Sequence, residues 1–444
     1  MNAADIAALD IVRRAAHWFE PGPAGLGPLV EAFGDARMVL IGEASHGTHE
    51  FYRTRADLTQ RLIEEKGFNI VAVEADWPDA YRAGQWVRHE SHDPDAESAL
   101  GSFTRFPRWM WRNREVVRFL NWLRQYNELL APASRVGFFG LDLYSLHTSI
   151  EAVLGYLQKV DPTAATRARY RYSCLGQFGE DPQDYGYAAS FGLTRHCEDE
   201  VVQELVELRR RAAEYATRDG RVAAENYFAA EQNARLIANA EAYYRAMFGG
   251  RVESWNVRDM HMMETLEALT SHVERTTGRA RAIVWAHNSH LGDARATQMS
   301  TWGELNLGQL VREKFEDEAA LIGFTTHTGS VTAASNWGEP AQRMTVRPSI
   351  QDSYERLFHH TDIPRFVLLM NDDDVRAALV PQRLERAIGV VYRPDSERLS
   401  HYFTTTLSQQ FDAVIHFDES SALQPLEPWS RDEVDLPETY PTGI

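Results

Sequence analysis

The feature that most constrains the fold is a series of short apolar, β-branched runs, each bounded by polar turns. Such runs are typical of strands buried on both faces of a sheet. Between the first two runs, Glu50–Gly67 alternates charged and apolar residues at helical period and stops at a glycine. This order of elements predicts an α/β fold with a central, largely parallel sheet flanked by helices. The predicted strands are Arg37–Ile41, Asn69–Val73, Arg135–Leu141, Arg281–Trp285, Ala319–Phe324, Arg365–Leu369, Ile388–Tyr392 and Ala413–Phe417.

The middle of the chain follows a different pattern. From about residue 146 to 275 there are no β-rich runs, and the long segments Glu198–Arg218, Val222–Met247 and Val257–Val273 have helical periodicity. We therefore expect a helical insertion in a single α/β domain that spans residues 1–444. Within it, the Gly- and Tyr-rich segment Tyr170–Gly192 is either a lid or a connecting loop. From about residue 424, Pro and acidic residues without periodicity predict a short C-terminal tail.

Composition and charge narrow the class of protein. The chain has 444 residues, 44% of them hydrophobic, which is enough apolar material for a packed core. Its net charge of −18 repels phosphate backbones and anionic lipids, so we expect neither nucleic acid nor a membrane as partner. Charged residues interrupt the N-terminus where a signal peptide needs an apolar core. Cys174 and Cys197 are too few for a disulfide framework, which favours a cytoplasmic protein. The sequence leaves the oligomeric state open.

Charged residues and imidazoles follow four successive predicted strands. Glu43 and His46 follow the first, Glu74 the second, and His287 the fourth, while Asp142 follows the third. In open α/β sheets, ligands bind beyond the carboxyl ends of the strands, where the loops converge. A lone residue of this kind is more often a helix cap or a buried hydrogen-bond partner. Because unpaired charges are costly to bury, four together favour a common site in which Glu43, His46, Glu74 and His287 lie close to one another.

This set of residues is suited to hydrolysis. A His beside carboxylates can act as a general base and deprotonate water near neutral pH. Ser45 lies on a strand-to-helix turn that half resembles the nucleophile elbow G-x-S-x-G, but Glu43 stands where the elbow has its first glycine. We therefore prefer a turn-stabilising or helix-capping role for the Ser45 hydroxyl.

Metal binding is a third interpretation of the same residues. Glu43, His46, Glu74, His287 and His290 are all competent ligands for a divalent transition ion. The H-E-x-x-H motif is absent, however, and the two histidines at 287 and 290 lie on a predicted loop, where their spacing has no defined geometry. We therefore expect neither a metal nor any other cofactor.

Long segments around these residues resemble the erythromycin esterase family. They are IGEASHGTHEFYRTR, VAVEADW, FPRWMWRNREV, GLDLYS, WAHNSHL and IGVVYRPDSERLSHYF, and the similarity runs from about Val39 to Phe417. The resemblance implies an α/β hydrolase-like site without a serine triad. It also implies that a His activates water to attack an ester carbonyl, with the opening of a macrolide lactone as the named activity of the family.

The resemblance further implies roles for five residues. His46 would be the general base, and Glu43 and Glu74 would hold and polarise it or the water. His287 would polarise the carbonyl or protonate the leaving alkoxide. Arg55 would pair with a carboxylate or stabilise the oxyanion.

Four further residues are candidates for substrate binding: Trp77, Trp109, Arg258 and His290. Trp109 belongs to an aromatic segment with Phe106, Trp111 and Trp122, which either lines a large apolar cleft or packs in the core, as tryptophans at near-helical spacing more often do. Arg258, near the start of a predicted helix, either reaches the cleft or forms an exposed charge pair.

The sequence thus predicts a hydrolase for a small-molecule ester or lactone. One alternative is a metal-dependent hydrolase that uses the same Glu and His residues. The other is a non-catalytic homologue that binds a carbohydrate or a partner.

Overall fold

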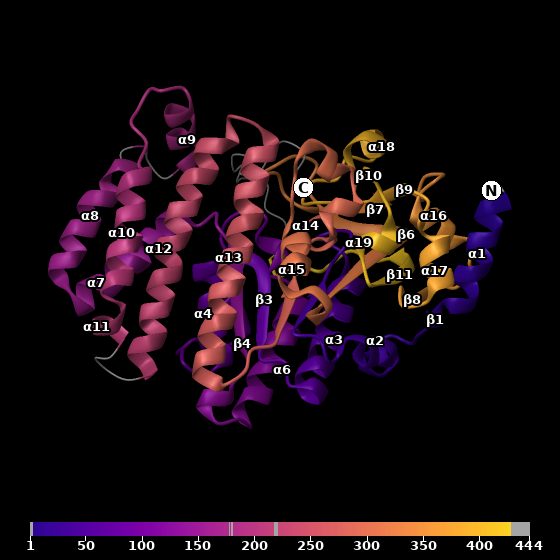
Figure 1. Ribbon diagram of the computed structural model, residues 1–444, viewed down its shortest axis with the longest axis horizontal. Coiled ribbons are helices and arrows are strands. Elements are labelled where there is room, and N and C mark those ends of the chain that lie inside the picture. The colour runs from indigo at the N-terminus through magenta and orange to yellow at the C-terminus, as the bar shows by residue number, and fades with distance from the viewer. Residues whose placement is uncertain (1–2, 177, 179–180, 217–220, 428–444) are drawn as a thin grey trace. The chain divides into compact units, whose positions relative to one another are not determined.

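The computed structural model of the protein describes residues 3–176, 178, 181–216 and 221–427 (Figure 1). The chain divides into two compact units. The first consists of residues 1–74, 82–138 and 273–444, and the second of residues 75–81 and 139–272. The predicted tail from about residue 424 lies mostly outside the described residues.

A nine-stranded sheet organises the described part of the chain. Its order is β1-β8-β11-β6-β2-β5-β3-β4, with β7 paired to β6. β11, β6, β2, β5 and β3 are parallel, whereas β8, β1 and β7 pair antiparallel with their neighbours. This confirms the predicted fold class. The strands are β1 His17–Trp18, β2 Met38–Ile41, β3 Ile70–Asp76, β4 Gly137–Asp142, β5 Ala282–Trp285, β6 Ala319–Ala333, β7 Gln342–Val346, β8 Arg365–Leu369 and β11 Ala413–Ser420.

One strand prediction is wrong. Ile388–Tyr392 forms isolated bridges to loops instead of a strand. The Ile388 amide donates to the Ala44 carbonyl and the Tyr392 amide to the Ala334 carbonyl, both at 2.9 Å, so these donors bond two different segments of the chain. The strands on either side, β9 (Arg383–Arg386) and β10 (Tyr402–Thr405), pair with each other in a separate sheet that the sequence did not predict.

Helices α3 (His49–Lys66) and α6 (Arg114–Glu128) cover β5 with apolar side chains. Trp285 of β5 contacts Phe119 with ring centroids 4.7 Å apart, and its indole N–H donates to the Thr59 hydroxyl at 2.9 Å. α3 ends as predicted, because Gly67 takes a left-handed conformation (φ 68°) that favours glycine. The other α-helices outside residues 139–277 are α1 Ala3–Ala15, α2 Gly27–Phe33, α4 Trp77–Val87, α5 Ala96–Ala99, α14 Asn288–Leu291, α15 Leu307–Phe315, α16 Tyr354–His359, α17 Asp373–Ala378, α18 Glu397–Ser400 and α19 Leu407–Gln410.

From residue 146 to 277 the described chain is helical. The helices are α7 Leu146–Val160, α8 Pro162–Gly176, α9 Pro182–Ser190, α10 Glu198–Arg210, α11 Ala212–Ala216, α12 Arg221–Met247 and α13 Arg251–Thr277. α12 packs against α7, α9, α10 and α11. The described part of Tyr170–Gly192 is largely helical and not a connecting loop, because it belongs to α8 as far as Gly176 and to α9 from Pro182. Asp181 caps α9 by accepting from the Gln183 amide.

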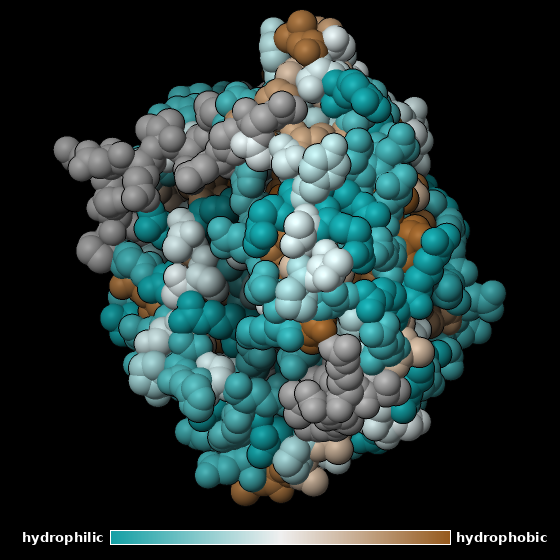
Figure 2. All heavy atoms as spheres, turned by 90° about the vertical axis from the view of Figure 1, so that its left-hand side faces the viewer, coloured by the Kyte–Doolittle hydropathy of each residue, from teal (hydrophilic) through white to brown (hydrophobic). Residues whose placement is uncertain are grey.

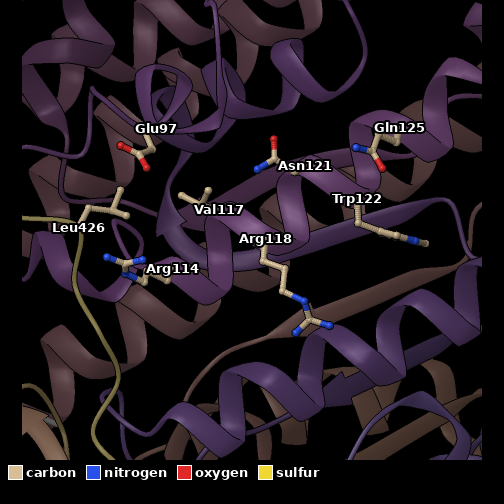
Figure 3. A pocket seen from close by; sticks show the side chains of 8 residues that line it. All are labelled: Glu97, Arg114, Val117, Arg118, Asn121, Trp122, Gln125 and Leu426. Carbon is tan, nitrogen blue, oxygen red and sulfur yellow. The ribbon is translucent and has the colours of Figure 1, made fainter.

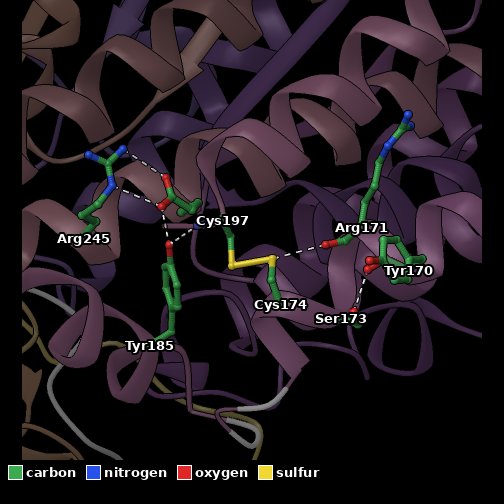
Figure 4. The surroundings of a disulfide bond; sticks show 8 residues. Tyr170, Arg171, Ser173, Cys174, Tyr185, Cys197 and Arg245 are labelled. Atoms are coloured by element: carbon green, nitrogen blue, oxygen red, sulfur yellow. Dashed lines mark hydrogen bonds and ion pairs between the residues drawn. A yellow bond between two sulfur atoms is a disulfide. The ribbon is translucent and has the colours of Figure 1, made fainter. Parts of the chain in front are cut away.

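A disulfide joins Cys174 at the end of α8 to Cys197 before α10, with Cα atoms 6.0 Å apart (Figure 4). Beside it, the Tyr185 hydroxyl accepts from the Cys197 amide at 2.9 Å and donates to Glu241, which Arg245 also binds. Burial raises the pKa of Tyr185. The two cysteines were not expected to pair, and the disulfide removes the argument for a cytoplasmic protein that rested on them. A cytoplasmic location stays a prediction.

The face of the helices α7–α11 drawn in Figure 2 is mostly hydrophilic, with hydrophobic residues in separate spots. This is typical of amphipathic helices that bury their apolar sides against one another. Among the described helices, none combines the length and apolar character needed to cross a membrane.

Candidate active site

The loop after β2 brings Glu43 and His46 together. β2 lies between β5 and β6, so this loop leaves the interior of the sheet and not its edge. The Glu43 Oε1 atom lies 2.9 Å from His46 Nδ1, and both side chains are buried. When Nδ1 donates to the carboxylate, the Nε2 atom of the neutral ring keeps a lone pair that can accept a proton.

Arg55 of α3 binds the other oxygen of the same carboxylate. Its Nη2 atom lies 2.8 Å from Glu43 Oε2, and the Arg55 side chain is fully buried. The guanidinium stacks over the rings of Tyr52 and Trp285, 4.4 and 5.2 Å from their centroids. Glu43 is therefore held between a fixed cation and the imidazole, which orients the His46 ring.

Ser45 has a different environment from that of a nucleophile. Its hydroxyl is hydrogen-bonded to the Thr48 hydroxyl and is buried. Gly47, two residues further on, cannot be larger, because a Cβ there would collide with the Thr332 carbonyl. These contacts agree with a turn-stabilising role for Ser45.

Glu74, at the end of β3, holds the loop after β5. One oxygen accepts from the His287 backbone amide at 2.8 Å, and the other lies 3.4 Å from His290 Nε2. The resemblance implied that Glu74 holds His46 or water. In the structure Glu74 contacts the two histidines of the neighbouring loop, and the role implied by the resemblance stays a prediction.

The contacts of His287 define its tautomer. Its Nδ1 atom accepts from the Ser289 backbone amide at 3.2 Å and lies 2.8 Å from the Ser289 hydroxyl. A backbone amide only donates, so the hydrogen of the neutral ring is on Nε2. That atom is buried and has no hydrogen-bond partner among the described residues, although the Ala44 carbonyl lies near enough to influence the ring.

Burial, together with the nearby charge of His46, holds the pKa of His287 well below its usual value. The His287 ring is therefore neutral near pH 7 and offers an N–H donor. The His46 and His287 rings are adjacent, with centroids 4.9 Å apart. The structure thus brings a proton acceptor and a hydrogen-bond donor side by side.

The two candidate tryptophans are packed in the interior. Trp77 is 1% exposed and contacts Tyr81, Phe139 and Phe228 in the second unit. Trp109 lies in a short 3₁₀ helix, Arg108–Met110, and is 5% exposed. Both positions are typical of core residues, so a substrate-binding role for either one stays a prediction.

Arg258 lies in the second unit and is buried. It lies inside α13, which begins at Arg251, and not near the start of a helix as the sequence analysis expected. Its Nε and Nη2 atoms donate to the two oxygens of Asp142 at 3.0 and 2.6 Å, and its guanidinium stacks over Tyr144. This two-point ion pair engages both carboxylate oxygens of Asp142.

The aromatic segment is divided between the core and a cavity. Trp122 lines a cavity of about 730 Å³ along α6, whereas Trp111 is buried and Phe106 packs on Trp337. Figure 3 shows that most lining side chains of this cavity come from α6. Its charged groups are partly paired, since Arg118 binds Asp57 at 3.2 Å. The lining residues are Glu97, Arg114, Val117, Arg118, Asn121, Trp122, Gln125 and Leu426.

Sequence reasoning missed three polar residues at the site. Ser289 and Asn288 stand within the WAHNSHL segment, and their neighbouring histidines were the available signal. Glu385, which accepts from Asn288 at 3.1 Å, carries no local signal because it lies on the unpredicted strand β9.

The part of the chain that the structure describes contains no group of three or more His, Cys, Asp or Glu side chains arranged to hold a metal ion. The Glu and His side chains that suggested a metal site contact one another and backbone amides.

Comparison with known proteins connects this arrangement to a family. The model of the family described as erythromycin esterase matches residues 63–420. The chain is 22% identical over 415 residues to erythromycin esterase type II of Escherichia coli, which covers 89% of this chain and 92% of that protein.

Two solved structures have the same fold. One, described as a succinoglycan biosynthesis protein, has a TM-score of 0.75 and 20% identity, and covers 96% of this chain and 99% of its own. The other is a mutant of the erythromycin esterase EreC in its open conformation, with a TM-score of 0.63 and 16% identity, and covers 90% of this chain and 95% of its own.

Proposed function

The chain belongs to the erythromycin esterase family, a family of hydrolases, and on that premise we propose that it hydrolyses a carboxylic ester or lactone with water activated by His46. The observation that carries this proposal is the chain of contacts from Arg55 through Glu43 to His46, with the His287 donor alongside.

The proposed reaction has two steps. His46 Nε2 takes a proton from water as the water oxygen attacks the carbonyl carbon, which gives a tetrahedral intermediate. The His287 Nε2–H donates to the developing oxyanion, a role that suits a neutral ring. The C–O bond to the alcohol then breaks, and protonated His46 returns the proton to the leaving alkoxide. Glu43 stabilises the imidazolium between the steps, and Arg55 keeps Glu43 in place.

The substrate class is the finer part of the proposal. The names of the Escherichia coli relative and of EreC support macrolide lactones as the first compounds to test. The residues of the proposed reaction are catalytic groups and carry no information on the size of the ring.

A panel of esters tests the reaction and the substrate together. The purified protein is assayed with 14-membered macrolides, sugar acetates and p-nitrophenyl esters. Hydrolysis of at least one class that is lost in His46→Ala supports the proposal. Failure to hydrolyse every class, by a protein that is folded by circular dichroism, would contradict it.

The panel also separates this proposal from the metal-dependent alternative. We expect turnover to continue after dialysis against EDTA, because the proposed base and donor are both side chains. Loss of turnover in EDTA that zinc or manganese restores would favour the metal-dependent hydrolase.

A further inference from the structure

We infer that Asn288 is a positioning residue that fixes the His46 loop and the His287 loop relative to each other, and that Gly42 is required to make room for its side chain. The inference rests on the proposed function, since it assigns Asn288 to the alignment of the proposed base and donor. Asn288 touches no reacting atom in this scheme.

The backbone of Asn288 joins the two loops. Its amide donates to the Glu43 carbonyl at 2.8 Å, so the residue after His287 is bonded to the residue that holds His46. Asn288 is also the first residue of α14, in which His290 lies. A shift of Asn288 therefore moves the His287 ring relative to the Glu43–His46 pair.

The side chain of Asn288 bonds two further strands, β6 and β9. It thereby anchors the point where Asn288 joins the two loops, which we call the Asn288 junction. Its Oδ1 atom accepts from the Phe324 amide of β6 at 3.2 Å, and its Nδ2 atom donates to the Phe324 carbonyl at 2.8 Å. Nδ2 also donates to Glu385 Oε1 of β9 at 3.1 Å. The side chain is fully buried, and its donors and acceptor are all used.

Gly42 and Asn288 are matched in shape. A Cβ at Gly42 would collide with the Asn288 Oδ1 atom. The Gly42 amide meanwhile bonds the Ile322 carbonyl of β6 at 2.8 Å, which prevents the backbone from moving away. The Asn288 side chain, from the loop after β5, thus explains why the residue before Glu43 is a glycine.

Glu385 provides an acceptor that suits this junction. Burial, with the nearby charge of Glu355, raises the pKa of Glu385 to about 8, so the carboxyl is mostly neutral at pH 7. Asn288 is therefore bonded to a mostly neutral carboxyl group.

The chain contains a matched control for a purely structural asparagine. Asn127 is also fully buried, and its side chain bonds the Val136 amide at 2.8 Å and the carbonyls of Val136 and Val87 at 2.9 and 3.0 Å. Its partners do not include the Glu43 or His287 loops. Loss of either asparagine removes a comparable set of hydrogen bonds.

The experiment compares Asn288→Ala with Asn127→Ala in the full chain. We expect both to lower the melting temperature, and only Asn288→Ala to lower kcat, by about 10- to 100-fold with KM little changed, since small misplacements of catalytic groups have effects of this size. Equal kcat in the two variants at a temperature where both are folded would overturn the inference.

The single variant Gly42→Ala keeps the test decisive if Asn288→Ala does not fold, because the added Cβ displaces the Asn288 side chain without removing it. Gly42→Ala should lower kcat, and a folded Gly42→Ala variant with the kcat of the wild type would overturn the inference. Where Asn288→Ala folds, the effects in the double variant Gly42→Ala/Asn288→Ala should be less than additive because the collision is gone. Full additivity would contradict the matched shapes.

A readout without turnover separates this inference from the proposed function. The imidazole resonances of His46 and His287 should move in Asn288→Ala and stay unchanged in Asn127→Ala, as measured by NMR of histidine-labelled protein. If the wild type hydrolyses no ester while these resonances respond as expected, the proposed function fails and the positioning role stands. Resonances that move equally in both variants would reject the positioning role.

Discussion

His46 and Ser45 are adjacent in the sequence and have different partners in the structure. The imidazole is oriented by the Glu43 carboxylate, whereas the Ser45 hydroxyl is hydrogen-bonded to the Thr48 hydroxyl, which is not a base. Attack by water requires His46 as the base, whereas a covalent acyl-enzyme requires Ser45 as the nucleophile. Variants of these two residues therefore distinguish the two mechanisms.

We predict that His46→Ala lowers kcat by roughly 10²-fold or more, the usual scale for loss of a general base, with substrate binding comparatively intact. Ser45→Ala should cost much less. Steady-state kinetics with the best ester of the panel measure both. A burst of product in the wild type, or a Ser45→Ala variant as damaged as His46→Ala, would indicate a serine nucleophile.

His287 provides a prediction about pH. Because burial keeps the pKa of His287 well below its usual value, the ring does not change charge around neutral pH. His287→Ala should lower kcat by about 10²- to 10³-fold, as for an oxyanion donor, and leave the midpoint of the pH–rate profile where it is in the wild type. A shifted midpoint would show that His287 titrates during the reaction.

At the scale of elements, β9 carries two buried charged residues, Glu385, which Asn288 contacts, and Arg386. The Arg386 amide donates to Glu355 at 2.8 Å, and the Arg386 Nε atom lies 3.2 Å from Glu397. The Glu385 carboxyl has one oxygen, Oε2, with no hydrogen bond among the described residues. Burial and the nearby charge of Glu355 raise the pKa of Glu385, so this residue makes stability depend on pH.

The free energy of unfolding should fall as the pH rises because of Glu385. Glu385 has a pKa of about 8 in the folded chain, above the ordinary value of 4.5, so its favourable contribution is complete below pH 4.5 and is lost as pH rises towards 8. Glu385→Gln removes the ionisation. The free energy of unfolding of the wild type should thus fall relative to that of Glu385→Gln between pH 5 and about 8, measured by urea denaturation. A constant difference over this range would contradict the assignment.

At the scale of the whole molecule, the chain divides into a sheet-containing unit and a helical unit, and the disulfide lies entirely within the helical one. It joins residues 23 apart in the sequence, across α9. A cross-link of this span limits the unfolded chain more than the folded one.

We predict that Cys197→Ser destabilises the helical unit by about 3 kcal/mol, the loop-entropy scale for a link of this length. Denaturation followed by hydrogen exchange in α8–α10 measures the change. Dithiothreitol should have the same effect on the wild type and none on Cys197→Ser. Two thiols that react with maleimide in the untreated native protein would contradict the bond.

Features that depend on a local pattern of residues could be predicted from the sequence. Apolar runs predicted most strands of the main sheet, and the periodicity of Glu50–Gly67 predicted α3, because burial on a sheet or along one helix face leaves a repeat in the residues themselves. The positions of Glu43, His46, Glu74 and His287 after strands followed from the same pattern, since parallel strands end on one side of a sheet.

The hydrogen-bond and ion-pair partners of the polar groups could be assigned from the three-dimensional structure and not from the sequence. The Ile388–Tyr392 run looks like a strand, yet its amides bond loops that are distant in the sequence. Glu74 binds the loop of His287, Arg258 binds Asp142, and Gly42 makes room for Asn288. Such contacts join residues up to hundreds of positions apart and depend on the register of strands and on the space between side chains, neither of which leaves a periodic signal in the sequence.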